Sequence, residues 1–115
     1  MTVSLIVSSP KSDEYRNFYI PLATEEVFRR IWLTAAKETN AFWLPMFETG
    51  VDVSVSDFEE VSGELNLLRR WVEHQPQTNI PKSEKDKVLE RIEALLKGLN
   101  SLSLNGSSSL TVFIG

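Results

Sequence analysis

The chain has 115 residues, of which 42% are hydrophobic and 24% are charged, as is typical of one globular domain. It has no cysteine, which excludes disulfides, thiolate metal sites and a cysteine nucleophile. The net charge of −4 disfavours nucleic acid as a partner, and no apolar stretch reaches the roughly 18 residues of a membrane helix. The apolar stretch at residues 3–7 is too short for a signal peptide. We therefore expect a single cytoplasmic domain, residues 1–115, that binds neither nucleic acid nor membrane.

Two segments near the N-terminus alternate between apolar and polar side chains, which is typical of half-buried strands. They cover residues 2–8 and 15–21, and turn-forming residues lie between them. The pattern predicts a β-hairpin with a loop of about six residues. One face of this hairpin carries Val3, Leu5, Val7, Phe18, Ile20 and Leu22.

A helix is expected to follow the hairpin. Thr24 is a good N-cap residue, and the two glutamates after it suit the positive end of a helix. An apolar stripe at helical spacing then predicts a helix over about 25–38. The stripe consists of Val27, Phe28, Ile31, Trp32 and Ala35.

The middle of the chain is densely apolar at residues 41–47 and then alternates at residues 51–55, which predicts either a short strand or an extended connection. Ser56 and Glu59 have the spacing of a capping box. An apolar repeat from Phe58 onward predicts a second helix over about 57–74, ended by Pro76.

The last third of the chain predicts a third helix over about 84–101, with Ser83 and Asp86 as a second cap. Asn105 and Gly106 end this helix, and an alternating segment over 110–114 closes the chain as a strand. The order β-β-α-α-α-β predicts an α+β fold: a small, three-stranded antiparallel sheet with three amphipathic helices packed mainly on one face.

The opposite face of that sheet is unusually apolar for a face in contact with water. Its expected members are Ile6, Tyr15, Tyr19 and Phe113, among Ser4, Ser8, Asn17 and Thr111. An apolar patch on an open sheet is typical of an interaction site, so we expect a partner protein or a second copy of the chain there. A homodimer is the simplest form of this hypothesis.

Acidic residues are concentrated between positions 48 and 64, where there are six acids and no base. Asp57, Glu60 and Glu64 are the candidates for docking a basic partner. The alternative is a solvated surface that only aids solubility. The segment lacks a calcium-loop pattern, so we expect no metal site.

Aromatic residues give two further candidates. The cluster Phe42, Trp43 and Phe47 is either core or an interface anchor, and the small size of the domain favours core. Trp71 lies at the edge of the second helix's apolar stripe, which favours partial exposure and makes it a candidate contact residue.

Motifs for catalysis are missing from the sequence. His74 is the only histidine, and its place at a helix end favours a solvated residue over a general base. There is no Gly-x-Ser-x-Gly sequence and no glycine-rich phosphate loop. We therefore expect no enzyme and no cofactor.

These features together favour a non-catalytic binding protein. In its small size, acidic charge and lack of catalytic groups the chain resembles bacterial immunity proteins, which neutralise toxins by binding them. The resemblance implies an immunity- or antitoxin-type role. The alternatives are a small hydrolase-like enzyme that uses carboxylates or a serine, and a structural subunit whose only activity is homo-oligomerisation.

Overall fold

The computed structural model describes residues 2–7, 18–105 and 110–115. The four strands β1 (Thr2–Val7), β2 (Tyr19–Thr24), β3 (Val51–Ser54) and β4 (Thr111–Ile114) form one antiparallel sheet in the order β2-β1-β4-β3. The α+β class is confirmed, but the sheet has four strands rather than three. The segment after residue 50 is the additional edge strand, because its backbone pairs with β4 from Val51↔Ile114 to Ser54↔Thr111.

The first helix occupies residues 25–38, as predicted. It comprises α1 (Glu25–Val27), one π-helical turn η2 (Phe28–Trp32) and α2 (Leu33–Glu38). The hydroxyl of Thr24 accepts a hydrogen bond from the Val27 N–H at 3.2 Å, which confirms the predicted cap. The π turn widens the helix where Phe28 and Trp32 stack at 5.6 Å between ring centroids, both fully buried.

The predicted capping box of the second helix is wrong. The helix α3 (Phe58–Glu73) is preceded by a 3₁₀ turn, η4 (Val55–Asp57), which contains Ser56. The last extended residue is therefore Ser54, two positions earlier than expected, and the backbone at Ser56 is already helical. The residue before α3 makes no side-chain capping bond.

The third helix is longer than predicted. It forms α4 (Lys82–Asn105), which begins two residues earlier and ends four residues later than the expected 84–101. Pro81 explains the early start: its carbonyl accepts from the Lys85 N–H at 2.9 Å, and its fixed φ suits the beginning of a helix. At the other end, Leu102 continues the buried stripe.

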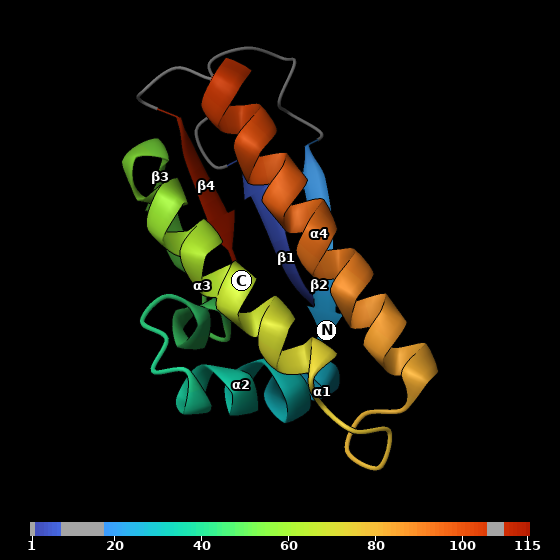
Figure 1. The fold of residues 1–115 in the computed structure, drawn as a ribbon. Helices are drawn as coiled ribbons and strands as arrows, with labels where there is room; N and C mark the ends of the chain where they lie inside the picture. The colour runs from blue at the N-terminus through green and yellow to red at the C-terminus, as the bar shows by residue number, and fades with distance from the viewer. Residues whose placement is uncertain (1, 8–17, 106–109) are drawn as a thin grey trace.

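The helices cover one face of the sheet. Figure 1 shows α3 and α4 side by side in front of the strands, with the first helix running across the lower end of this layer. Between the layers lies the core, to which the strands contribute the set that the alternation predicted. The buried strand residues are Val3, Leu5, Val7, Leu22, Val53, Val112 and Ile114, and Leu110 next to β4 is buried with them. Phe18 and Ile20 pack against this core while half-buried.

In the described residues no helix is long and apolar enough to span a bilayer. The predicted hairpin loop, Tyr15 and the Asn105–Gly106 turn involve residues 8–17 or 106–109, which lie outside the described ranges.

Candidate interaction surface

The strand register places three large apolar or aromatic residues, two of them exposed, in one row across the sheet. Tyr19 lies opposite Ile6, Ile6 opposite Phe113, and Phe113 opposite Asp52. Directly paired residues share a face, and neighbouring strands are about 4.8 Å apart, so the row is roughly 14 Å long. The buried residues that alternate with the row, Leu5, Val53 and Val112, face the helices, so the row lies on the face opposite to the one that α3 and α4 cover (Figure 1). We call Tyr19, Ile6, Phe113 and Asp52 the sheet row.

The apolar members of the sheet row are open to water. The exposed fraction is 42% for Ile6 and 55% for Tyr19, whereas Phe113 is half-buried. The remaining described positions on this face are Thr2, Ser4, Pro21, Thr24, Ser54 and Thr111. Asp52 is thus the only charged residue among the described positions of the face. Few charges together with tyrosine and phenylalanine are the composition of an interface core.

The ring of Phe113 packs directly against two glycines, Gly50 and Gly115. A Cβ built on Gly50 would lie 2.5 Å from the Phe113 Cζ atom, and one built on Gly115 would lie 2.9 Å from its ring. Both distances are far below van der Waals contact, so the ring occupies the space that side chains would take. Gly50 also has a φ of +104°, a conformation that residues with a Cβ rarely adopt. The aromatic ring is therefore already positioned on the face.

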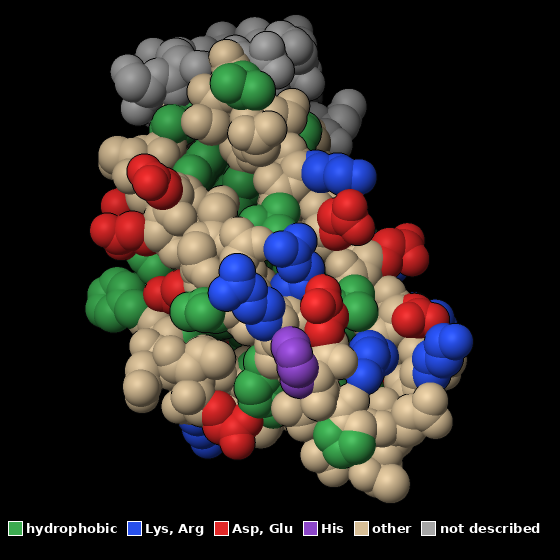
Figure 2. All heavy atoms as spheres, in the orientation of Figure 1, with side chains coloured by type: hydrophobic (Ala, Val, Ile, Leu, Met, Phe, Trp, Pro, Cys, Tyr) green, Lys and Arg blue, Asp and Glu red, His purple; other side chains and the backbone are tan. Residues whose placement is uncertain are grey.

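The helix side looks different. Figure 2 shows lysine and arginine side chains intermixed with aspartate and glutamate over the surface of the helical layer. Such a mixture is typical of a face in contact with water. The scarcity of charge on the sheet face is thus a local property and does not extend to the helix side.

The three acidic docking candidates make hydrogen bonds within the chain. The Glu64 carboxylate accepts from the backbone N–H groups of Phe42, Trp43 and Leu44 at 2.8–3.1 Å. Glu60 accepts from the indole N–H of Trp43 at 3.2 Å. These two carboxylates hold the turn that leads into the 3₁₀ helix η3 (Leu44–Phe47).

The third candidate, Asp57, accepts from the Ser54 hydroxyl at 2.9 Å. All three carboxylates therefore already have partners in the chain. None of them belongs to the sheet row.

The aromatic candidates are separated by the structure. Phe47 is fully buried, Trp43 is half-buried, and Phe42 is 68% exposed, with its ring edge-on to Trp43 at 5.5 Å. Trp71 is half-buried, as expected, and its indole N–H donates to Glu38. The exposed Phe42 and the half-buried Trp71 both lie in the helical half of the molecule, away from the sheet row.

His74 lies in the open at the end of α3, with its Nδ1 2.6 Å from the Arg70 carbonyl oxygen. In the described part of the chain, no three acidic or histidine side chains are close enough together to hold a metal ion.

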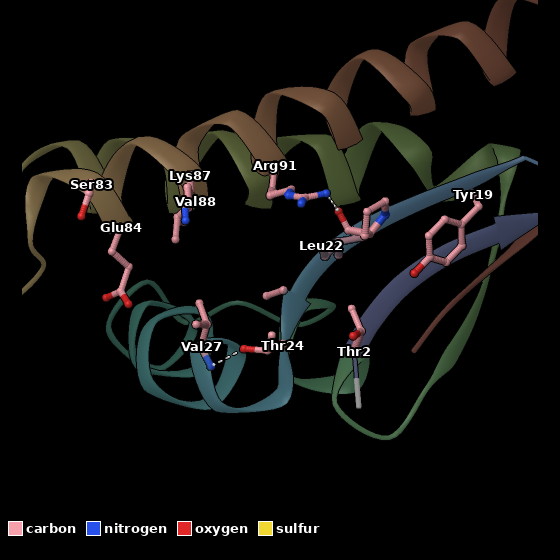
Figure 3. A pocket seen from close by; sticks show the side chains of 12 residues that line it. Thr2, Tyr19, Leu22, Thr24, Val27, Ser83, Glu84, Lys87, Val88 and Arg91 are labelled. Atoms are coloured by element: carbon pink, nitrogen blue, oxygen red, sulfur yellow. Dashed lines mark hydrogen bonds between the residues drawn. The ribbon is translucent and has the colours of Figure 1, made fainter.

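A cleft that the sequence did not indicate lies along β2. Figure 3 shows it between α4, the first helix and the outer edge of β2, and its volume is about 620 Å³. At one end is Glu84, which accepts two hydrogen bonds from Arg30 at 2.7 and 2.6 Å. These bonds lower the pKa of Glu84 and raise that of Arg30. The pair joins the first helix to the start of α4.

No family model matches the chain, and neither a curated protein nor a solved structure matches it.

Proposed function

We propose that the protein acts by binding and not by catalysis, and that the sheet row is the centre of a homodimer interface. The observation that carries the proposal is the composition and alignment of the row: three large side chains lie next to one another on a face where the described strand positions include a single charged residue. Exposed apolar patches of this kind mark interaction sites.

A second copy is the occupant because the row complements itself. In a two-fold dimer whose axis is perpendicular to the row and lies between the two sheets, the row of one copy runs antiparallel to the row of the other. Tyr19 of each copy then faces Asp52 of the other, and Ile6 faces Phe113. The phenol hydroxyl donates to the carboxylate, so the charge of Asp52 has a partner in the dimer. The four side chains in the middle form an apolar contact between sheets about 10 Å apart.

The energetics favour a weak dimer. A large apolar side chain contributes roughly 1.5–3 kcal/mol when it is fully removed from water. Ile6, Tyr19 and Phe113 are each only partly exposed, so the six side chains of two copies contribute roughly 5–9 kcal/mol in total. Association costs roughly 4–15 kcal/mol. Taking the largest gain and the smallest cost leaves about −5 kcal/mol, which corresponds to a dissociation constant of roughly 0.2 mM, so we expect a dimer no tighter than the high micromolar to millimolar range.

The experiment compares two substitutions that each place a glutamate on an exposed apolar position. Ile6→Glu puts two like charges into the middle of the interface. Leu104→Glu puts the same charge on α4, where Leu104 is 75% exposed and away from the sheet face. Sedimentation velocity from about 10 µM to 1 mM should show a rising average mass for the wild type and for Leu104→Glu, and a constant monomer for Ile6→Glu.

Circular dichroism confirms that each variant is folded. A wild type that stays monomeric up to 1 mM would overturn the homodimer. A loss of association in Leu104→Glu equal to that in Ile6→Glu would show that the added charge, and not the sheet row, controls it. Protein partners other than a second copy, including the toxin that an immunity-type role requires, compete for the same face and would be tested by the same Ile6→Glu variant.

A further inference from the structure

The cleft along β2 lies at the edge of the sheet and shares Thr2, Tyr19, Pro21 and Thr24 with the sheet face, while the rest of its lining comes from other parts of the fold. Its walls come from the outer edge of β2, from α1 and from the first half of α4. Its volume of about 620 Å³ is within the range of roughly 300–1,000 Å³ typical of small-molecule sites. Of the sheet row, only Tyr19 also lines the cleft, at one end.

The floor of the cleft is apolar. Leu22 and Val88 are buried there, and Ala23 and Val27 are half-buried beside them. A bulge in β2 opposite Val3 and Ser4 turns Leu22 inward and moves the edge strand locally out of register. Such a floor accommodates a hydrocarbon chain.

The rim of the cleft carries two cations with no acidic partner. Lys87 and Arg91 are one turn apart on α4, and neither forms an ion pair within the described part of the chain. Figure 3 shows Arg91 extending from α4 toward β2, where it donates to the Pro21 carbonyl at a long 3.4 Å. The guanidinium therefore points into the cleft with a weak partner.

The one acid that lines the cleft does not neutralise these cations. Glu84 is engaged by both terminal nitrogens of Arg30, which itself lies outside the lining. The cleft is thus locally cationic in a protein whose net charge is −4. Like charges four residues apart on a helix repel each other, and an anion between them removes that repulsion.

We infer that this cleft binds a small carboxylate with an apolar body, such as a medium-chain fatty acid, whose hydrocarbon chain lies on the floor and whose carboxylate lies between Lys87 and Arg91. Arginine and lysine are the usual partners of a carboxylate, and the bond from Arg91 to Pro21 is weak enough to be replaced. The inference does not rest on the proposed dimer, because both cations are on α4 and away from the sheet face.

The test is a titration of the full-length protein with octanoate at pH 7, in which isothermal calorimetry and changes in amide NMR shifts measure binding. We expect saturable binding with a Kd on the order of 0.1–1 mM, given the size of the probe. The shifts should include Leu22, Ala23 and Val27. Octanol, which lacks the charge, and acetate, which lacks the chain, should each bind at least tenfold more weakly.

Two double variants with the same loss of charge isolate the cations. Lys87→Gln with Arg91→Gln should weaken octanoate binding at least tenfold. Lys37→Gln with Lys97→Gln removes two exposed cations elsewhere and should leave the affinity unchanged. Circular dichroism shows whether both fold. Absent saturable binding, equal loss in both double variants, or octanol bound as tightly as octanoate would each overturn the site.

Discussion

Several residues have roles that follow directly from their position in the sequence pattern. Thr24 caps the first helix, and Leu65 and Leu68 are fully buried at the centre of the stripe of α3. These roles depend on neighbours three or four residues away, which a sequence shows. Ser56 differs, because its role depended on where the extended backbone ends, and that point is set by the pairing of β3 with β4.

Glu64 has a role that the sequence did not reveal, since its partners lie 20–22 residues away along the chain. We expect Glu64→Gln to lower the free energy of unfolding by about 1–3 kcal/mol, because three backbone N–H groups lose a charged acceptor. Glu59→Gln, on the exposed side of the same helix, should change it by less than about 0.5 kcal/mol. Urea unfolding measures both, and equal values for the two variants would contradict the assignment.

Two glycines provide opposite predictions for the same substitution. Gly50→Ala should destabilise the protein by about 1–3 kcal/mol, because the new Cβ meets the Phe113 ring and the backbone has a φ of +104°. Gly63→Ala should stabilise it by about 0.5–1 kcal/mol, since Gly63 is inside α3 with open space around it. Thermal unfolding of both variants is the measurement. A melting temperature that rises for both variants would contradict the packing of the Phe113 ring against Gly50.

At the scale of elements, long amphipathic helices were predictable and the short strand was not. The stripes of α3 and α4 extend over many turns, so their apolar periodicity is clear. The alternation at residues 51–55 is too short to distinguish a strand from a connection. Its strand state depends on pairing with β4 at the other end of the chain, which no local pattern shows.

The ion pair between Arg30 and Glu84 joins two elements and should make their association depend on pH. The hydrogen bonds from Arg30 hold the pKa of Glu84 below its ordinary value. A group with a lowered pKa stabilises the folded state above its unfolded pKa, and this contribution is lost as the pH falls through the folded pKa. Both side chains are partly exposed and screened by water, so the contribution is about 0.2–1 kcal/mol at pH 7.

The comparison is between the wild type and Glu84→Gln in urea unfolding at several pH values. The difference in the free energy of unfolding between wild type and Glu84→Gln should be largest near pH 7. It should shrink as the pH falls below 4.5, the ordinary pKa of a glutamate such as Glu84. Arg30→Gln should remove the same pH-dependent contribution to the free energy of unfolding. A difference that is constant from pH 7 to pH 3 would show that the pair contributes nothing through charge.

At the scale of the whole molecule, the strand order determines what the surface offers. The chain ends in β4, which lies between β1 and β3, so Ile6 and Phe113 come from the two central strands. Alternation alone predicted which residues leave the core, and Ile6, Tyr19 and Phe113 were among them. Their alignment in one row and the place of Asp52 at its end required the register of four strands.

The cleft along β2 is also a property of the whole fold. Its cations lie on α4 and its floor comes largely from β2 and α1, segments that are far apart in the sequence. Neither stretch has a recognisable ligand motif. The site arises because the bulged edge of β2 lies beside α4, and for that reason only the three-dimensional arrangement reveals it.

In the proposed dimer, two copies meet through the sheet row in antiparallel alignment. The most direct measurement is an isotope-filtered nuclear Overhauser experiment on a mixture of labelled and unlabelled protein near 1 mM, which detects only contacts between copies. We expect contacts between the Ile6 methyl groups and the Phe113 ring, and between the Tyr19 ring and the Asp52 Cβ protons. Contacts between copies that involve only helix residues, or none at a concentration where sedimentation shows dimer, would contradict it.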